Sequence, residues 1–202
     1  MIDTERAALL PVSFFRRPAD LVAHDLIGAV VISTVRGVRT AGRIVEVEAY
    51  LGHSDPASHG YQNRRHAQNE GLYGPAGSWY VYLSYGVHWC ANLVAGRRPN
   101  EGAVLIRALE PLEGLQAMRR RRGGGMADRR LAAGPGRLTQ ALGITRSLDR
   151  WPVRGSVVQV FQGVPQAPVV ATPRIGITQA VEWPLRFVEG GSRWASRAAP
   201  KA

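Results

Sequence analysis

Three strand-length apolar runs, which follow one another with short turns between them, constrain the fold of this chain more than any other feature. They cover residues 78–85, 87–94 and 103–109, and they are separated by Gly86 and by the polar segment 96–102. Apolar runs of this length bounded by turn-forming residues are typical of strands, and turns this short join antiparallel neighbours. We therefore predict an antiparallel meander in the middle of the chain.

The segments on either side of this meander predict further strands and short helices. Strands are expected over residues 28–33, 39–50, 157–161, 174–177 and 185–188, the first two joined by a hairpin at Arg36 and Gly37. Helices are expected over residues 18–26, 111–122 and 134–142. The second of these helices has a proline in its first turn and arginines in its last, which suits the helix dipole.

No internal repeat and no long linker divides the 202 residues, so one domain is the simplest organisation. The predicted fold class is mixed α/β (α+β), a single compact domain over residues 1–202 in which short helices flank a curved, largely antiparallel sheet. The core is expected to span about residues 18–190. The ends are expected to be frayed, with a mobile tail from Gly190 onward.

The charge of the chain favours a polyanionic partner. Lysine and arginine together number 26 against 15 acidic residues, which gives a formal net charge of +11. Such an excess attracts nucleic acid, although an arginine-rich genome would decorate a surface in the same way. Lys201, next to last in the chain, is the only lysine, so the predicted core contains no amine nucleophile.

The sequence also excludes several other classes of protein. The longest apolar stretch, residues 26–32, is far shorter than the roughly 20 residues of a membrane-spanning helix, and the first residues lack the layout of a secretion signal. The single cysteine, Cys90, cannot form an intramolecular disulfide or a cysteine-rich zinc motif. We expect a soluble monomer of the cytoplasm, associated with the nucleoid if its source is bacterial, that needs no membrane, metal or cofactor.

Aromatic and titratable side chains gather in one part of the chain. All six tyrosines lie between residues 50 and 85, and four of the five histidines lie between residues 53 and 88. The polar segment 53–76 between the predicted strands is long for a loop in a compact domain, and such loops are often functional. The alternative is that Tyr80 and Tyr82 only pack a sheet face, since tyrosine is common in strands.

The strand predicted over residues 39–50 carries two carboxylates on one face. Strand alternation places Glu46, Glu48 and Tyr50 together, with valines on the other face. Neighbouring side chains on one strand face are about 7 Å apart and point the same way, which does not suit the paired acid and base of an ordinary sugar hydrolase. One carboxylate acting as a base and the other as support is the favoured interpretation, and a solvated face paired with arginine is the alternative.

Five segments, in this order, resemble the 3-methyladenine (alkyladenine) DNA glycosylase family of the mammalian type. They are residues 43–52, 58–59, 80–92, 105–111 and 133–138. The resemblance implies a compact mixed α/β fold. It also implies that the protein removes alkylated or deaminated purines from double-stranded DNA without a metal, and such enzymes rotate the damaged nucleotide out of the base stack.

By this resemblance, particular residues receive roles in DNA and base binding. Tyr85, at the predicted turn, would enter the minor groove and fill the gap left by the flipped nucleotide, with Val87 and His88 beside it. Tyr50 and Tyr82 would sandwich the extruded purine. The remaining base and phosphate contacts are assigned to His59, which would hydrogen-bond the purine edge, to Asn92, which would crowd the amine of guanine, and to Gly134, Gly136 and Arg137, which would hold a phosphate.

The resemblance also assigns the chemistry. Glu48 is the candidate general base that deprotonates the attacking water, and Arg107 would hold that water or a flanking phosphate and keep Glu48 ionised. No general acid is identifiable. With Lys201 as the only lysine, we expect a monofunctional enzyme without a lyase step. A Glu48 carboxylate that is sealed in the interior, or that lies farther from Tyr50 and Tyr82 than a nucleobase could span, would overturn this hypothesis.

Two other functions are consistent with parts of the sequence. A noncatalytic, basic nucleic-acid-binding module on the same scaffold would explain the charge. A metal-dependent hydrolase would use histidines of the polar loop as ligands, although their spacing is loose. The candidate ligands for that second function are His53, His59, His66 and Glu48.

Overall fold

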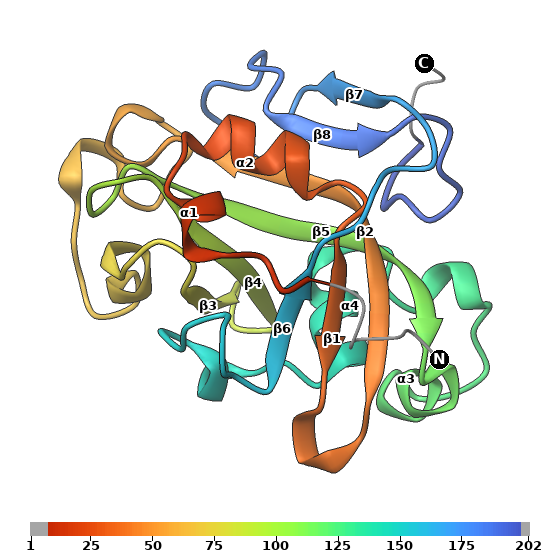
Figure 1. Ribbon diagram of the computed structural model, residues 1–202. Helices are drawn as coiled ribbons and strands as arrows, with labels where there is room; N and C mark the ends of the chain where they lie inside the picture. Colours follow the sequence, from red (N-terminus) through yellow and green to blue (C-terminus); the bar gives the residue numbers. More distant parts are fainter. Residues whose placement is uncertain (1–7, 199–202) are drawn as a thin grey trace.

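A single antiparallel sheet organises the computed structural model, which describes residues 8–198 (Figure 1). Its main path runs in the order β3-β4-β5-β2-β1-β6, and β8 joins it by pairing with both β2 and β7. All pairings between neighbouring strands in this part of the chain are antiparallel. The predicted fold class is therefore confirmed: a mixed α/β domain with one antiparallel sheet and few helices.

The predicted meander forms one side of this sheet. It consists of β3 (Trp79–Ser84), β4 (His88–Ala95) and β5 (Gly102–Glu113). Strand β5 is longer than predicted because it continues through Pro111, which pairs opposite Gly42 at an irregularity in the ladder. Since proline lacks a backbone N–H, it is tolerated where the ladder is already interrupted.

Strand β2 (Thr40–Tyr50) is the centre of the sheet. One edge pairs with β5 along most of its length, and the other edge is shared between β1 (Val30–Ser33) and β8 (Arg186–Glu189). The hairpin between β1 and β2 is present and turns through Arg36, which has a φ of 56°. Nearly every residue of β2 is buried, so its two carboxylates cannot lie on a solvated face.

Two of the later predicted strands fall where expected and one does not. β6 (Val158–Phe161) and β8 are confirmed, whereas residues 174–177 form a loop instead of a strand. The structure instead contains a strand just upstream, β7 (Val169–Thr172), which the sequence did not predict. Register explains the difference, since Thr172 pairs with Arg186 at the end of the β7–β8 ladder and the chain then leaves the sheet.

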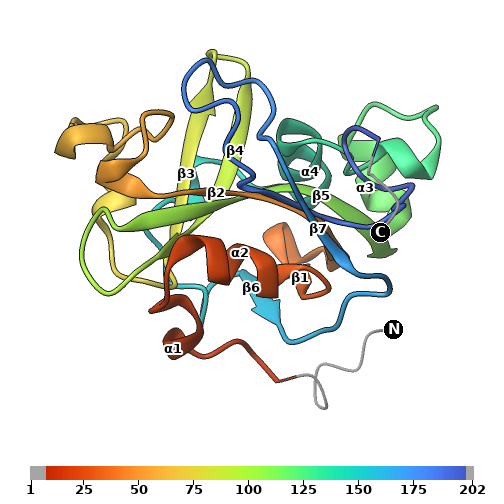
Figure 2. The same cartoon turned by 90° about the horizontal axis from the view of Figure 1, so that it is seen from above.

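Within residues 8–198, four short α-helices flank the sheet. They are α1 (Val12–Phe15), α2 (Ala19–Leu26), α3 (Leu115–Arg121) and α4 (Pro135–Leu142). Figure 2 shows α2 and α4 on opposite sides of β2 and β5. The helix predicted to begin at residue 111 begins at Leu115, because Gly114, with a φ of 76°, ends the strand and starts the helix. Short 3-10 helices occupy Val35–Gly37, Gly52–Ser54, Tyr61–Asn63, Glu70–Tyr73, Asp128–Arg130 and Arg146–Leu148.

The packed part of the chain extends beyond both ends of the predicted core. Leu10 and Phe15 are buried upstream of residue 18. Downstream of Gly190, the backbone N–H of Ser196 donates a hydrogen bond to Glu46 at 2.5 Å, so the prediction of a mobile tail is wrong over residues 190–198. Residues 1–7 and 199–202, to which the prediction of frayed ends also applies, lie outside the described part. Between residues 8 and 198, no helix has the length and apolar character that crossing a membrane requires.

Candidate active site

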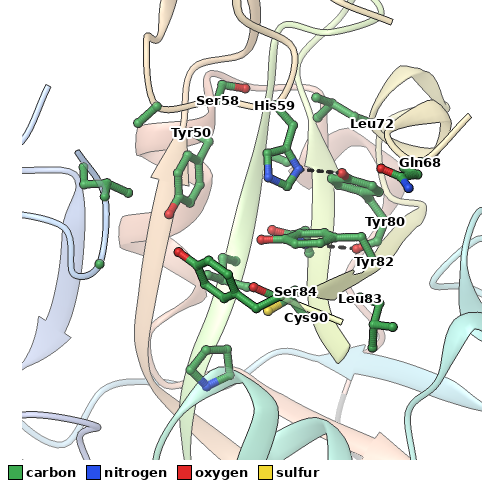
Figure 3. A pocket seen from close by; sticks show the side chains of 18 of the residues that line it. Tyr50, Ser58, His59, Gln68, Leu72, Tyr80, Tyr82, Leu83, Ser84 and Cys90 are labelled. Carbon is green, nitrogen blue, oxygen red and sulfur yellow. Dashed lines mark hydrogen bonds between the residues drawn. The ribbon is translucent and has the colours of Figure 1, made fainter. Parts of the chain in front are cut away.

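A large cavity opens beside the end of β2, and half of the predicted site residues line it (Figure 3). Its volume is about 1080 Å³, and its walls come from the central strands, the 51–78 loop, the β3–β4 turn and residues 175–179. Six predicted residues lie on its surface, namely Tyr50, His59, Tyr82, Tyr85, Asn92 and Arg107. The fold thus gathers side chains that are widely separated in the sequence.

Two tyrosines form facing walls of this cavity. Tyr50 is the last residue of β2, Tyr82 lies within β3, and Figure 3 shows their side chains on either side of the open space. Behind Tyr82, the ring of Tyr80 stacks at a centroid distance of 5.2 Å. The ring of His59 meets Tyr82 edge to face at 4.5 Å. Walls of this kind suit a flat aromatic ligand.

His59 is held in place by Tyr80. Its Nδ1 lies 2.8 Å from the Tyr80 hydroxyl, so Nε2 is the ring nitrogen left for a ligand. Burial lowers the pKa of His59, and the neighbouring His66 lowers it further. The imidazole is therefore neutral near pH 7 and offers either a donor or an acceptor, according to its tautomer.

Asn92 is fixed against the cavity by the meander itself. It lies on β4 opposite Tyr80, and its amide nitrogen donates to the carbonyl of Tyr80 at 3.0 Å. The residue is only 4% exposed, yet it lines the cavity. A side chain held in this way cannot turn aside for a ligand, so it can select ligands by shape.

Glu48, the predicted base, is sealed from the cavity in this structure. Its side chain has no exposed surface and does not line the cavity. Oε2 accepts hydrogen bonds from the Tyr50 hydroxyl at 3.0 Å and from Arg107 at 3.1 Å, while Oε1 accepts one from the backbone N–H of Ile175 at 2.7 Å. The expectation of a carboxylate open to the pocket is wrong, because the Tyr50 hydroxyl, Arg107 and the Ile175 N–H surround its two oxygens.

The environment of Glu48 also changes its acidity. Burial raises the pKa of Glu48, although Arg107 and the Ile175 N–H oppose the rise. Charge pairing with Arg107 was expected to keep Glu48 ionised; the pairing is present, but desolvation has the larger effect on the pKa. A buried carboxylate with a raised pKa is a stronger base than an exposed one.

Arg107 joins Glu48 to a second buried carboxylate. Its Nε donates to Glu46 at 3.1 Å, and Glu46 also accepts a bond from Arg186 at 2.7 Å and two from Ser196. Burial alone would raise the pKa of Glu46, but Arg186 and Arg107 outweigh it and the pKa is lowered. We call this group the cavity floor; its members are Glu46, Glu48, Arg107, Arg186 and Ser196.

The β3–β4 turn projects from the rim of the cavity. Tyr85 at its tip is 91% exposed and has a φ of 51°, and Val87 is 70% exposed. His88 is also exposed. A tyrosine in the left-handed region costs about 1–2 kcal/mol of backbone energy, and strained exposed residues are often functional.

A second, basic cavity adjoins the first. Its volume is about 470 Å³, and Arg107, Pro135 and Ile175 line both cavities. The predicted phosphate contacts Gly134, Gly136 and Arg137 lie here, at the start of α4. His88 packs closely against Gly136: a Cβ atom added to Gly136 would lie 2.8 Å from the Cβ of His88. The other charged residues of the lining are Arg122 and Arg197, and no carboxylate of the described residues lines this cavity.

Sequence reasoning missed the loop that closes the site. Residues 173–179, between β7 and β8, place the Ile175 N–H on Glu48 and line the cavity from residue 175 onward. The loop is anchored by Arg174, which forms a fully buried ion pair with Asp55. A buried Arg–Asp pair between residues so far apart in the chain leaves no local sequence pattern. The one available signal was a single charged residue, Arg174, within an otherwise uncharged segment.

The histidines proposed as metal ligands do not gather around Glu48. His53 is exposed on the 3-10 helix Gly52–Ser54, and His66 is exposed in the same long loop. Between residues 8 and 198, no group of three His, Cys, Asp or Glu side chains has an arrangement that could hold a metal ion. The geometry therefore gives the metal-dependent hydrolase no support.

Comparison with known proteins agrees with this fold and cavity. Residues 13–193 match the model of a family of DNA glycosylases, described as methylpurine-DNA glycosylase. That match covers most of the chain. The protein belongs to the methylpurine-DNA glycosylase family, and it is a DNA glycosylase by class.

Curated relatives cover nearly the whole chain. A protein of Methanoculleus marisnigri, named as a candidate 3-methyladenine DNA glycosylase, is 47% identical over 195 residues, which span 93% of this chain and 98% of the relative. A protein of the same name from Rhodopseudomonas palustris is 46% identical over 91% of this chain and 88% of the relative. Another, from Burkholderia cenocepacia, is 43% identical over 96% of this chain and 93% of the relative.

Proposed function

We propose that this protein excises 3-methyladenine and related alkylated purines from duplex DNA by flipping the damaged nucleotide into the large cavity. The observation that carries the proposal is the hydrogen bond from the Tyr50 hydroxyl to Glu48. It connects a wall of the aromatic cavity directly to a buried carboxylate. The relatives named above support the choice of 3-methyladenine as substrate.

The cavity matches an extruded purine in size and chemistry. Tyr50 and Tyr82 would stack on its two faces, and His59 and Asn92 would meet its edges. An alkylated purine carries positive charge, so stacking on tyrosine gains a cation–π contribution that a normal purine lacks. Misfit against the fixed Asn92 side chain would disfavour guanine, which carries an extra amine.

Hydrolysis would proceed at the anomeric carbon of the flipped nucleotide. The oxygen of water bonds to C1′ as the bond from C1′ to the purine nitrogen breaks, and the water gives its proton to Glu48. The alkylated purine leaves as a neutral base because the bonding electrons cancel its positive charge. Negative charge on Glu48 would also stabilise the cationic sugar in the transition state, with Arg107 holding the carboxylate in place.

The sealed position of Glu48 adds a requirement to this mechanism. Both carboxylate oxygens already accept hydrogen bonds, and Oε1 is covered by the Ile175 N–H. Ile175 and Gly176 line the same cavity that the purine would fill. A carboxylate sealed in this way cannot act as a base, so the mechanism requires that substrate displaces residues 175–179, beyond the Arg174–Asp55 anchor, and admits water to Oε1.

Surfaces around the cavity suit the handling of DNA. Tyr85, with Val87 and His88 beside it, is exposed at a turn that can enter the minor groove and replace the flipped base in the stack. The basic cavity at Gly134, Gly136 and Arg137 would receive a backbone phosphate. Because the two cavities share lining residues, the base and a neighbouring phosphate of one nucleotide would occupy them together.

The proposed enzyme hydrolyses the base–sugar bond and does not cut the strand. A lyase step requires an amine that forms a Schiff base, and Lys201 is the only lysine in the chain. Borohydride added during turnover should trap no protein–DNA adduct. An adduct that maps to an internal residue would overturn the monofunctional assignment.

Glu48→Gln is the direct test. Release of free 3-methyladenine from a duplex oligonucleotide is expected to fall by roughly 10²- to 10⁴-fold, because the base is lost. Binding of the same duplex should persist. A noncatalytic DNA-binding module predicts instead that the wild-type protein releases no base and that the substitution changes nothing.

Glu189→Gln is the matched control. Glu189 is also a buried glutamate of the sheet and is paired with Arg43, but it does not line the cavity. Release per folded molecule should stay at the wild-type level. Equal losses per folded molecule in both variants would show that the effect is not specific to Glu48 and would remove the catalytic assignment.

A further inference from the structure

The two tyrosine walls of the cavity are supported in different ways. Tyr82 is backed by the neutral ring of Tyr80, stacked at 5.2 Å. Tyr50 is backed by a cation, because the guanidinium carbon of Arg174 lies 4.7 Å from the centre of its ring. The difference has a consequence for any ligand that carries charge.

Arg174 lies on the side of Tyr50 that faces away from the ligand. Its side chain has no exposed surface and does not line the cavity, whereas Tyr50 does. It donates two hydrogen bonds to Asp55, at 2.5 and 2.9 Å, and one to the carbonyl of Ala49 at 3.1 Å. These bonds fix the guanidinium against the outer face of the ring.

A cation on one face of an aromatic ring weakens the attraction of a second cation to the other face. Both interact with the same electron-rich π system, and they repel one another through the ring. Tyr50 responds to this charge: burial raises the pKa of its hydroxyl, and Arg174 opposes that rise. Stacking of a neutral purine on the inner face carries no such penalty.

We propose that Arg174 determines specificity, by weakening the stacking of cationic alkylpurines on Tyr50 relative to neutral purines of the same shape. The inference rests on the proposed function, since it concerns which purines the same cavity prefers. Arg174 touches no reacting atom and acts through Tyr50. Asp55 moderates the effect because its carboxylate pairs with the guanidinium. The pocket is thereby suited to accept uncharged damaged bases beside charged ones.

The test compares two ligands that differ only in charge. Duplexes carry either 3-methyladenine, a cation, or its neutral isostere 3-deaza-3-methyladenine, and their dissociation constants are measured with the Glu48→Gln protein over times too short for its residual cleavage to matter. In the Arg174→Met, Asp55→Asn double variant, preference for the cationic duplex should rise by roughly threefold or more. A change in loop position or in folded fraction alters both constants together and leaves their ratio unchanged.

Two further variants keep the test decisive. Asp55→Asn alone leaves the guanidinium without its counter-charge, so preference for the cation should fall, and this result decides the question if the double variant does not fold. Arg43→Met with Glu189→Gln removes another buried bidentate pair away from the cavity and should leave the ratio unchanged.

An unchanged or lowered preference in the folded double variant overturns the role of Arg174. So does an Asp55→Asn protein in which preference for the cation is unchanged or raised. Failure of the wild-type protein to release 3-methyladenine would instead overturn the proposed function itself, so the two failures are distinguishable.

Discussion

The cavity floor and the β3–β4 turn lie next to each other but are built in opposite ways. Every carboxylate and guanidinium of the floor is almost fully buried and bonded to others, and its members come from three strands and the C-terminal segment. The turn, by contrast, exposes Tyr85 and Val87 to solvent. The side chains of the floor are held by hydrogen bonds and ion pairs, whereas the Tyr85 side chain at the turn tip lies mostly in solvent.

This contrast separates two tasks that one enzyme must perform. A group that activates water needs a fixed position and a low dielectric, which buried hydrogen bonds provide. A side chain that enters DNA must stay exposed to solvent. In this turn the exposed position of Tyr85 is accompanied by a strained, left-handed backbone conformation. Substitutions in the floor should therefore affect stability and chemistry together, whereas substitutions in the turn should affect DNA handling alone.

The largest effect on stability is expected in the floor, at Glu46. Glu46→Gln breaks buried pairs with Arg107 and Arg186 and should lower the free energy of unfolding by about 3–5 kcal/mol. Glu48→Gln should cost clearly less, because burial already raises the pKa of Glu48 toward the neutral form that glutamine mimics. Urea unfolding of both variants at pH 7 measures the difference, and equal losses would contradict it.

The turn is expected to show the opposite pattern. Tyr85→Gly removes the inserted side chain but relieves the positive φ, so the melting temperature should stay constant or rise slightly. Single-turnover release of 3-methyladenine should fall by roughly tenfold or more, because unstacking costs a few kcal/mol that the tyrosine no longer offsets. A variant that keeps full activity would show that Tyr85 does not act as the wedge.

The pH dependence should distinguish the two carboxylates of the floor. Glu48 must be ionised to act as a base, so base release should disappear as the pH falls through its raised pKa, above the value of about 4.3 for an ordinary glutamate. For stability the two carboxylates have opposite signs. The contribution of Glu48, whose pKa is raised, is present at low pH and is lost as the pH rises through its folded value. The contribution of Glu46, whose pKa is lowered, is present above the unfolded-state pKa and is lost as the pH falls through its folded value.

The pH profile of single-turnover release checks the activity prediction. The Glu48→Gln protein, with its residual rate, serves as the control and should lack this acid limb. A wild-type rate that stays constant down to the ordinary glutamate range would contradict the raised pKa.

The smallest effect is expected at the basic cavity. Arg137→Ala should weaken binding of all duplexes, damaged or not, by a similar small factor, and it should reduce the slope of log affinity against log salt concentration by about 1. A titration at several salt concentrations measures this. Arg154→Ala, a surface arginine outside both cavities, is the control.

The sequence was sufficient to predict the meander, and its family resemblance pointed to six of the residues that line the cavity. Turn signals and strand-length runs are local, so β3, β4 and α4 were found close to their observed bounds. The enclosure of Glu48 could not be predicted, because it depends on Ile175, which arrives from a distant loop. Backbone donors carry no residue-specific signal, and the pairing of Arg174 with Asp55 is visible only after the chain has folded.

The bonds from Ser196 to Glu46 also bear on how the protein is made. The strands of the meander leave the ribosome long before the segment that completes the floor. A nascent or prematurely terminated polypeptide that lacks this segment would carry its glutamates without all their partners. Competence for base excision should therefore appear only after Ser196 has been synthesised, and products truncated before this residue should be poorly active.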